Sequence, residues 1–345
     1  MALHSTPIRT AVIGFGLSGR TFHSPFIAAN PEYSLDVIVT GNPERQADAR
    51  RLHPKARVLA STGELFQQAG DLDLVVIGSP PASHADLADA TLEAGLAVVV
   101  DKPFTVTSDE GRALVEKADR LGATLTVFQN RRWDGDFLTL RGLIDDGTLG
   151  DVRRFESRFE FWKPAPRPSW KLGASPRDGG GLLYDLGPHL MDQALTLFGP
   201  VSDVYSETLT RRAGGLADDD VFVALTHESG VISHLWMNGL AAQKSPRLHV
   251  LGSESAYTVW GLDSQEAALK KGASPADLDF GVADEADWGL LGIDGDLRAY
   301  PTERGRYDLF YAGLADAILR GAPVPVDPRD ALRVIELIER IHSGR

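Results

Sequence analysis

The chain has 345 residues, of which 43% are hydrophobic and 24% charged, with a formal net charge of −13 and no cysteine. This length predicts two domains, and the absence of cysteine excludes disulfides and thiolate chemistry. The negative charge disfavours nucleic-acid and anionic-membrane partners, and neither a membrane span nor a signal-peptide pattern is present, so we expect a cytoplasmic protein.

The first apolar run, IRTAVIGFG at 8–16, predicts a strand that ends in a G-x-G-x-x-G pattern. Gly14, Gly16 and Gly19 precede a segment with helical spacing, which is the setting in which this pattern binds a dinucleotide. There the first glycine permits a tight turn, the second lets a pyrophosphate approach the backbone, and the third lets the helix pack closely on the strand. The helix N-terminus would offer N–H donors to the phosphates. The alternative is a glycine-rich turn without a ligand.

Apolar runs and helical stretches continue to alternate as far as residue 130. We expect further strands at 35–40, 56–60, 72–81, 96–103 and 123–130, and helices at 83–95 and 108–122. Near-continuous apolar strands separated by helices predict a parallel sheet that is covered on both faces. Ligands bind at the carboxyl ends of such strands, where Gly14, Ser79, Lys102 and Asn130 fall.

The end of the second strand predicts which dinucleotide binds. An NAD-preferring site carries an acidic residue there, whereas this chain reads Thr40-Gly41-Asn42 and has Asp36 at the opposite end of the strand. Arg45 is placed to meet a 2′-phosphate, so we predict NADP, with NAD as the alternative in which Arg45 is an exposed helix residue. The residues predicted to bind the cofactor are Gly14, Gly16, Leu17, Ser18, Gly19, Thr40, Asn42, Arg45, Ser79, Pro80, His84, Asp101, Lys102 and Asn130.

After residue 130 the alternation stops and runs of strands follow. We expect helices at 134–150 and within 178–199, strands at 151–162, 201–212, 220–230 and 231–240, and a hairpin at 247–261. This order predicts an α+β half with an antiparallel sheet. The acidic run 218–220 and the preceding RRAGG are interpreted as a solvated hairpin turn.

Lys102 follows a strand that is predicted to be fully buried, where an ammonium group is costly unless it is paired or used. Asp185 and His189 are four residues apart, so a helix would put them on one face. With a nicotinamide, these groups suit oxidation of a secondary alcohol. His189 would take the proton, Asp185 would fix its tautomer, and Lys102 would stabilise the developing alkoxide. The alternatives are a Lys102 that reaches the surface and a His189 that only packs.

Other chemistries find little support in the sequence. The histidines and acids lack metal-ligand spacing, and no G-x-S-x-G pattern occurs, so we expect neither a metal site nor acyl transfer. Trp162 and Trp170 flank a proline-rich loop and either line a polyol site or cap the sheet. The residues predicted to contact the substrate are Lys102, Arg131, Trp133, Trp162, Tyr184, Asp185 and His189.

The chain resembles the Gfo/Idh/MocA oxidoreductase family over nearly its whole length. The family's E-K-P motif appears as DKP at 101–103, with Asp101 in place of glutamate, and its D-x-x-x-H pair appears as Asp185 and His189. The stretches GFGLSGRTFHSP, NRRWDGDFLTL and LYDLGPHLMDQAL are most similar to the branch that contains NADP-dependent scyllo-inositol dehydrogenases.

The resemblance implies an α/β Rossmann domain at 1–129 and an α+β domain at 130–345 with an open, mostly antiparallel sheet. The last helix, at 329–342, would return toward the first domain, and the sheet's outer face would build a homodimer or homotetramer. Lys102, Asp185 and His189 would form the catalytic constellation. We therefore expect an NADP-dependent dehydrogenase of a cyclic polyol such as scyllo-inositol. Two alternatives are the same machinery acting on an aldose, ketose or nucleotide-linked sugar, and a catalytically silent NADP-binding protein.

Overall fold

The structure is a computed structural model that describes residues 6–165 and 174–344, and its contacts divide the chain into two units. The first unit comprises Met1–Phe128, Glu266–Phe280 and Tyr307–Leu332. The second comprises Gln129–Gln265, Gly281–Arg306 and Arg333–Arg345. The first unit therefore contains two segments from late in the chain, in addition to the continuous stretch that the sequence indicates.

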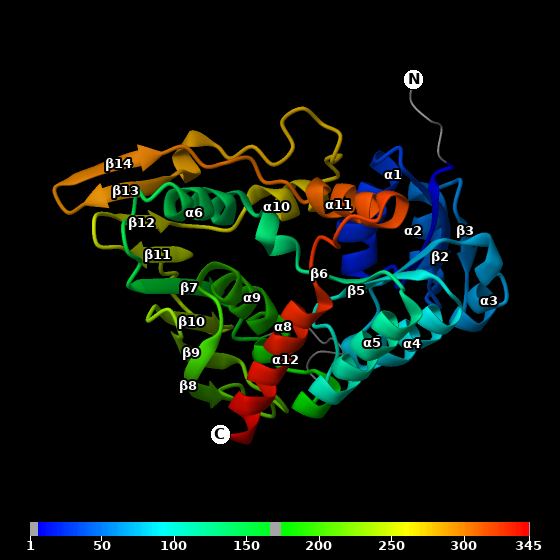
Figure 1. The fold of residues 1–345 in the computed structure, drawn as a ribbon, viewed down its shortest axis with the longest axis horizontal. Coiled ribbons are helices and arrows are strands. Elements are labelled where there is room, and N and C mark those ends of the chain that lie inside the picture. The colour runs from blue at the N-terminus through cyan, green and yellow to red at the C-terminus, as the bar shows by residue number, and fades with distance from the viewer. Residues whose placement is uncertain (1–5, 166–173, 345) are drawn as a thin grey trace. The chain divides into compact units, whose positions relative to one another are not determined.

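The first unit is built on the predicted parallel sheet, in the order β3-β2-β1-β4-β5-β6 (Figure 1). All of its strand pairs are parallel, and every residue of β4 is buried. This confirms the α/β class of this part of the chain. The strands are β1 (Ile8–Ile13), β2 (Tyr33–Val39), β3 (Arg57–Leu59), β4 (Leu74–Ile77), β5 (Ala97–Asp101) and β6 (Leu125–Phe128).

Helices connect these strands. Those at 83–95 and 108–122 were predicted, and Thr107 and Glu110 form a capping box at the start of the second. No helix range was predicted between β2 and β4, because α2 is mostly charged and buries only Ala49. The connecting helices are η1 (Gly19–His23), α1 (Ser24–Ala29), α2 (Pro43–Leu52), α3 (Thr62–Phe66), η2 (Ala69–Asp71), η3 (Pro81–Ser83), α4 (His84–Glu93) and α5 (Ser108–Leu121).

The late segments of the first unit add helices to its core. These are most of α10 (Ser264–Lys270), α11 (Asp308–Arg320) and the first turn of α12 (Pro328–Ser343). The ring of Phe310 in α11 packs edge-on against Phe128 of β6 at 4.8 Å, and the Tyr33 hydroxyl donates to the Tyr311 carbonyl at 2.6 Å. Such contacts between distant parts of the sequence explain why α11 belongs to this unit.

Two glycines after β1 lie where no side chain fits. Gly14 has a φ of +91°, and a Cβ there would lie 2.6 Å from the carbonyl oxygen of Gly78. A Cβ on Gly19 would lie 1.9 Å from the carbonyl oxygen of Gly14 and 3.2 Å from the Val12 side chain. The predicted tight turn and close helix–strand approach are therefore both present in the glycine loop, residues 14–19.

A buried histidine stands beside the end of β5. His23 in η1 is fully buried, its Nδ1 hydrogen-bonds to the Tyr311 hydroxyl at 2.7 Å, and its Nε2 lies 4.0 Å from the Asp101 carboxylate. Burial lowers the pKa of His23 to about 4, although Asp101 opposes the shift. The imidazole is therefore neutral near pH 7.

The second unit is built on a mostly antiparallel open sheet, in the order β14-β13-β12-β11-β7-β10-β9-β8. Among the described strands of this sheet, β7 and β10 form the one parallel pair. The predicted sheet is thus confirmed, while β13 and β14 were not predicted. The strands are β7 (Arg154–Glu160), β8 (Val201–Leu209), β9 (Asp220–His227), β10 (Ile232–Asn238), β11 (Leu248–Leu251), β12 (Ala256–Val259), β13 (Gly289–Ile293) and β14 (Asp296–Tyr300).

Helix α9 covers one face of this sheet through contacts with β7 and β10. The ring of Phe198 in α9 packs on Phe155 of β7 at 5.4 Å between centroids. The helices of the second unit are η4 (Asn130–Trp133), α6 (Gly135–Asp145), η5 (Pro176–Asp178), α8 (Leu182–Asp185), α9 (Gly187–Phe198), η6 (Glu285–Asp287), the start of α10 and most of α12.

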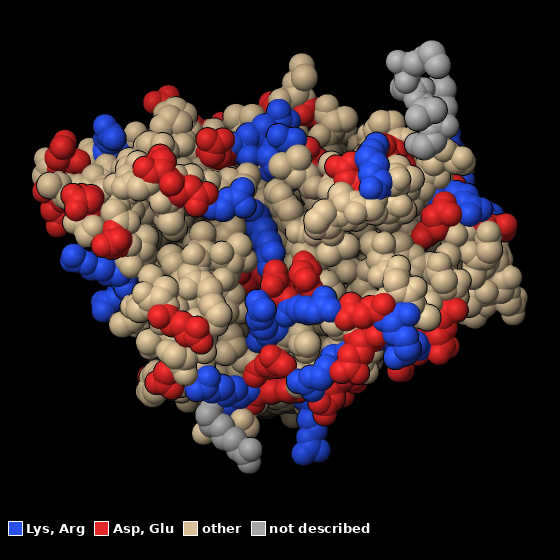
Figure 2. Space-filling view, in the orientation of Figure 1, with Lys and Arg blue, Asp and Glu red and all other residues tan. Residues whose placement is uncertain are grey.

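Charged side chains cover the surface in mixed order. Figure 2 shows acidic and basic groups interspersed over the visible face. In the first unit, for example, Lys117 pairs with Asp89 and Glu93 at 2.5 and 2.9 Å. None of the helices within residues 6–165 and 174–344 has both the length and the apolar character needed to cross a lipid bilayer.

We expect the substitution Gly19→Ala to destabilise the first unit by roughly 2–3 kcal/mol, because its Cβ would overlap the Gly14 carbonyl and force the backbone apart. Urea unfolding measures the change. Gly70→Ala is the matched control, since a Cβ there meets nothing within 4 Å. Equal stability of the two variants would show that the glycine loop tolerates a side chain.

We expect acid to destabilise the protein through His23. Its folded pKa of about 4 lies below the ordinary value of 6.5, so the unfolded state binds more protons between these pH values. Stability is therefore lost as pH falls from 6.5 to 4, by up to about 3 kcal/mol from this group. His23→Asn lacks this titration, so its unfolding free energy minus that of the parent should increase as pH is lowered from 6.5 to 4. A constant difference between the two proteins would contradict the assignment.

Candidate functional site

The residues predicted to bind the cofactor gather at one edge of the first unit, with the exception of Asn130, which lies in the second unit. The strand registers pair Ile13 with Val39 and Ile77, and Ile77 with Val100. The loops after β1, β2, β4 and β5 therefore leave the sheet at the same level. This is the edge at which ligands of parallel sheets bind.

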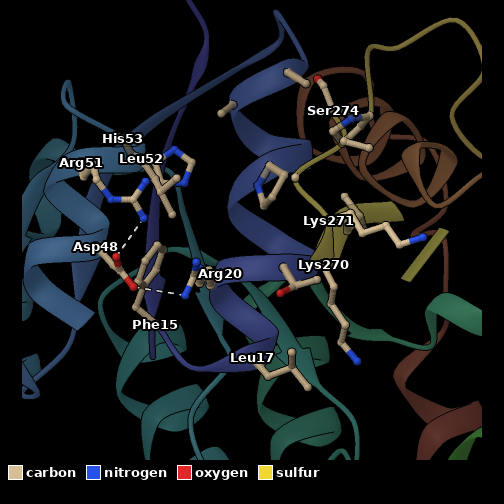
Figure 3. Close-up of a pocket in the computed structure, with 18 of the residues that line it drawn as sticks. Phe15, Leu17, Arg20, Asp48, Arg51, Leu52, His53, Lys270, Lys271 and Ser274 are labelled. Atoms are coloured by element: carbon tan, nitrogen blue, oxygen red, sulfur yellow. Dashed lines mark hydrogen bonds and ion pairs between the residues drawn. The ribbon is translucent and has the colours of Figure 1, made fainter. Parts of the chain in front are cut away.

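A cavity of about 1010 Å³ opens beside the glycine loop (Figure 3). Three of the predicted cofactor residues, Gly16, Leu17 and Arg45, line it. Five basic side chains and one carboxylate are also among its lining groups, so we call it the basic cavity. These charged groups are Arg20, Arg45, Asp48, Arg51, Lys270 and Lys271.

Arg45 stands over the glycine loop. Its backbone N–H donates to Oδ1 of Asn42 at 3.0 Å, which caps α2 and fixes where the side chain leaves the helix. A Cβ placed on Gly16 would lie 3.6 Å from Nη1 of Arg45. Asn42 therefore acts by capping the helix, while the guanidinium faces the space above Gly16, where a 2′-phosphate is expected.

His84 links two loops of this edge. It is 1% exposed, and its ring nitrogens lie 2.8 Å from the carbonyl oxygen of Pro103 and 2.9 Å from that of Ser79. Both ring nitrogens are thus engaged by backbone carbonyl groups, and the ring holds the two loops in position. Contact of His84 with the cofactor stays a prediction.

Lys102 lies at the end of β5 and is half-buried. Its backbone N–H donates to Oδ1 of Asp101 at 2.8 Å, and the peptide bond to Pro103 is cis. The carbonyl of Pro103 is held by His84, so the backbone is tied down on both sides of the lysine.

The expectation of one helix carrying Asp185 and His189 is wrong. Asp185 ends α8, and His189 lies near the start of α9, with Leu186 between the two helices. The reason is Pro188, which has no N–H and interrupts the helical ladder, so the N–H of His189 bonds to Leu186 instead of Asp185. Asp185 is half-buried and His189 is 6% exposed.

Phe159 packs beside His189, and two guanidinium groups lie near the same Phe159 ring. The ring of His189 lies nearly parallel to that of Phe159, at 6.4 Å and 23°. The guanidinium carbons of Arg131 and Arg247 lie 4.9 and 5.9 Å from the same Phe159 ring. Arg131 is buried and pairs with Asp134 at 3.1 Å. Arg131 is therefore held by Phe159 and Asp134, and its contact with a substrate stays a prediction.

Two carboxyl groups near this cluster, the buried Asp136 and the half-buried Asp263, were not predicted from the sequence. Burial, with Asp134 as second cause, raises the pKa of Asp136 to about 6 and that of Asp263 to about 7. Asp263 accepts the backbone N–H of Gly135 at 2.7 Å. The spacing of Asp134 and Asp136 was a visible signal, but nothing local indicated that Asp263 joins them.

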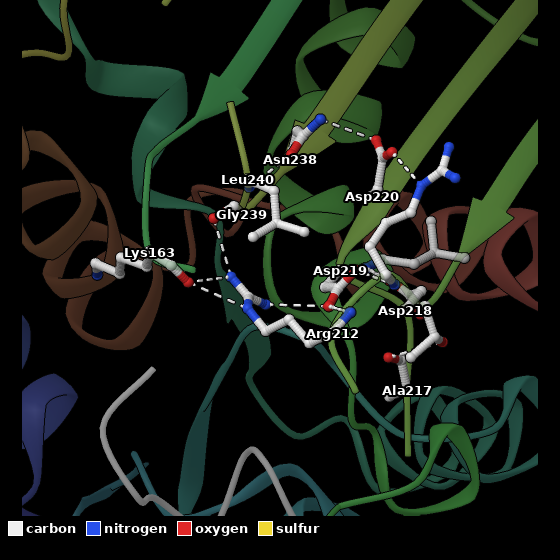
Figure 4. Close-up of polar contacts among 12 residues, drawn as sticks. Lys163, Arg212, Ala217, Asp218, Asp219, Asp220, Asn238, Gly239 and Leu240 are labelled. Atoms are coloured by element: carbon white, nitrogen blue, oxygen red, sulfur yellow. Dashed lines mark hydrogen bonds and ion pairs between the residues drawn. The ribbon is translucent and has the colours of Figure 1, made fainter. Parts of the chain in front are cut away.

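The acidic run at 218–220 is not a solvated turn, which corrects that part of the sequence interpretation, whereas the RRAGG stretch at 211–215 is mostly exposed as expected. Figure 4 shows the polar contacts of these residues. Asp218 and Asp219 are 8% and 4% exposed. Asp219 accepts two N–H groups and the guanidinium of Arg212, which also donates to the carbonyls of Lys163 and Gly239. The physical reason is that the carboxylates satisfy backbone donors inside the fold.

Asp218 positions the helix that bears Asp185. Its Oδ1 accepts the N–H of Leu183 at 2.7 Å, and its backbone carbonyl accepts that of Leu182 at 3.0 Å. Burial raises the pKa of Asp218, while the hydrogen bond from Leu183 opposes this shift. The first turn of α8 is therefore anchored on the β8–β9 hairpin.

The remaining predicted substrate residues differ in exposure. The Trp133 carbonyl accepts Nε2 of Gln265 at 3.1 Å, Trp162 is 56% exposed, and Tyr184 is 4% exposed with its ring stacked on His342. Trp170 lies outside the described residues. Among the described residues, no group of three or more histidines and acids is arranged to hold a metal ion.

Lys102 belongs to the first unit, whereas Asp185 and His189 belong to the second. Their convergence on one substrate stays a prediction. Each unit nevertheless presents its own part of the expected chemistry: a glycine loop, a basic cavity and a lysine in the first, and a carboxylate and an imidazole in the second.

Comparison with known proteins agrees with this arrangement. Residues 8–129 match the model of the oxidoreductase family with an NAD-binding Rossmann fold, and residues 137–258 match the model of the GFO/IDH/MocA C-terminal domain. The chain is 41% identical to the uncharacterized oxidoreductase YdgJ of Escherichia coli (strain K12), over 97% of this chain and 95% of that protein.

A second relative carries a named activity. The chain is 32% identical to the scyllo-inositol 2-dehydrogenase (NADP(+)) IolW of Bacillus subtilis (strain 168), over 96% of this chain and 92% of that protein. The solved structure of yvaA from Bacillus subtilis superposes with a TM-score of 0.91 at 31% identity, covering 98% and 95% of the two chains. The parallel and antiparallel sheets, the glycine loop and these matches together show that the chain belongs to the Gfo/Idh/MocA oxidoreductase family.

Proposed function

We propose that the protein is an NADP-dependent dehydrogenase that interconverts a cyclic polyol, such as scyllo-inositol, and the corresponding ketone. The observation that carries the cofactor choice is the Arg45 guanidinium above Gly16, at the edge of the basic cavity. The likeness to IolW, which is named for scyllo-inositol and NADP, supports the substrate class.

The residues of the first unit fit a dinucleotide bearing a 2′-phosphate. Gly16 leaves the backbone of the loop open toward the basic cavity, since a Cβ there would meet only the Arg45 guanidinium, and no side chain caps the start of η1. No ion pair involves Arg45 among the described residues, so its charge is available to a phosphate. A guanidinium binds phosphate through paired N–H donors.

In the proposed reaction a bound nicotinamide would supply the acceptor for the hydride of the alcohol carbon. Lys102 holds the alcohol oxygen by a charged hydrogen bond and stabilises the alkoxide as it forms. His189 takes the hydroxyl proton, which leaves a ketone, and returns it in the reverse direction. Asp185 lies close in sequence and would stabilise the imidazolium. The backbone bonds around Lys102 and the Phe159 ring beside His189 limit the motion of both groups.

We further propose that the protein works as a homodimer or homotetramer. The open sheet of the second unit carries exposed apolar side chains on several strands, which suits self-association. These side chains include Tyr205, Leu209, Ile293 and Leu297.

We expect turnover of scyllo-inositol with NADP, and a lower kcat/KM with NAD, because Arg45 favours the 2′-phosphate. Steady-state assays across inositol isomers, aldoses, ketoses and nucleotide-linked sugars measure this. Turnover of another sugar instead would change the proposed substrate from a cyclic polyol to that sugar and leave the proposed catalytic residues unchanged. No turnover of any polyol or sugar with either cofactor would refute the enzymatic proposal.

We expect Lys102→Met to lower kcat by at least about 10²-fold, since it removes the group that stabilises the alkoxide. Affinity for NADP, measured by calorimetry, should stay near that of the parent protein. Lys55→Met is the control, because Lys55 is an exposed lysine of the same unit that does not line the basic cavity. If Lys102→Met turned over as fast as the control, Lys102 would be a surface residue.

A further inference from the structure

One wall of the basic cavity comes from a segment far from the glycine loop in sequence. Residues 269–275, from the end of α10 to Pro275, line the cavity together with Gly16 and Arg45, and all belong to the first unit. Figure 3 shows Lys270, Lys271 and Ser274 on the side opposite Asp48, Arg51 and His53, with Arg20 between them. The segment lies outside both matched family models, which end at residues 129 and 258.

Most charges in the cavity already have partners. Asp48 accepts from Arg20 at 3.1 Å and from Arg51 at 2.9 Å, so the one carboxylate is shared by two guanidinium groups. Lys270 pairs with Glu266 at 2.5 Å. Among the described residues, Arg45 and Lys271 are the two lining cations for which no ion pair is present. They come from the two different walls of the cavity.

The backbone at Lys271 is held in a defined conformation. Lys271 directly follows the last residue of α10, Lys270, and Gly272 comes next with a φ of +93°. The N–H of Ala273 bonds to the carbonyl of Ala268 at 3.0 Å, and that of Gly272 bonds to Leu269 at 3.0 Å. These two bonds form a Schellman motif, which satisfies carbonyl groups at the helix end.

The same segment is anchored in the core of the first unit. Leu269 is 8% exposed and Phe280 is 4% exposed. The Phe280 ring packs edge-on against Phe26 of α1 at 5.9 Å. Lys271 therefore projects from a wall that is fixed relative to α1 and the glycine loop, although the lysine itself is exposed.

A phosphate monoester carries between one and two negative charges at neutral pH, so a single guanidinium neutralises it only in part. The chain as a whole has a net charge of −13, which makes a local excess of cations necessary for holding such an anion. A cavity of about 1010 Å³ is at the upper end of the range for small-molecule sites and has room for a nucleoside with its phosphate.

We propose that Lys271 and Arg45 form a two-sided clamp for the phosphate on the adenosine ribose, and that Lys271 is a specificity-determining residue for the phosphorylated cofactor. The inference rests on the proposed function, since it deepens the choice of NADP. Arg45 offers a planar pair of donors from the first wall. Lys271 supplies a point charge from the second wall.

The test measures binding of adenosine fragments rather than turnover. Calorimetry at low ionic strength compares 2′,5′-ADP, which carries the ribose phosphate, with 5′-AMP, which lacks it, on the full-length protein. We expect Lys271→Gln to weaken the binding of 2′,5′-ADP about fivefold, which is the size of effect expected for a partly exposed ion pair. The affinity for 5′-AMP should not change. The loss should shrink as salt is added. Lys271→Arg should restore most of the affinity, and Lys55→Gln, the matched control, should bind both fragments as the parent does.

The outcomes separate the two proposals. If the parent protein prefers 2′,5′-ADP and Lys271→Gln keeps the whole preference, the clamp is refuted while the NADP assignment stands. If the parent binds both fragments equally, the NADP assignment fails and the clamp fails with it. A loss of affinity for both fragments would assign Lys271 to the adenosine or its 5′-phosphate and would also refute the clamp.

Discussion

The first unit depends on a close approach of backbone to backbone at the end of β1. The carbonyl of Gly14 occupies the space where a side chain on Gly19 would stand, and the carbonyl of Gly78 occupies that of a side chain on Gly14. Three segments, the turn after β1, the start of η1 and the loop after β4, therefore meet with only hydrogen atoms between them. Any side chain would separate them, because a Cβ needs more than 3 Å from its neighbours.

This contact sets the position of the groups around it. The ring of His84 hydrogen-bonds to the carbonyl of Ser79 in the loop after β4 and to the carbonyl of Pro103. The glycine loop, the loop after β4 and the turn at Lys102 are therefore held together by direct contacts. Arg45 extends over the opened surface at Gly16 from the next loop along the sheet. A cofactor-sized site at this edge is thus built mainly from backbone geometry, and charge is added by a few side chains.

In the second unit, buried carboxylates hold separate backbone segments together. Asp218 and Asp219 accept backbone N–H groups and hold the start of α8 and the β8–β9 hairpin together. A buried carboxylate is costly unless its oxygens accept hydrogen bonds. Both oxygens of Asp219 do so, whereas only Oδ1 of Asp218 has a partner among the described residues, in keeping with the raised pKa of Asp218. The two helices bearing Asp185 and His189 are consequently placed by contacts with the sheet instead of by one continuous helical ladder.

Much of the fold and part of the candidate site follow from the sequence alone. The six parallel strands, the glycine loop and the strands from β7 to β12 were predictable because each is encoded by its own run of apolar residues or by glycines at fixed spacing. Arg45 could be placed beside the cofactor edge from its distance to the end of β2. The family motifs around Lys102 and His189 are equally local.

Other features were decided by tertiary structure. The burial of Asp218 depends on N–H donors from α8, which lies 35 residues earlier in the sequence. The placement of the Lys271 wall of the cavity depends on Phe280 packing against Phe26, a residue about 250 positions earlier in the sequence of the same unit. Local periodicity reports which face of an element is apolar, but it carries no information on which distant segment will cover that face. Contacts between residues far apart in sequence therefore determined the second wall of the cavity and the hydrogen bonds of the buried acids.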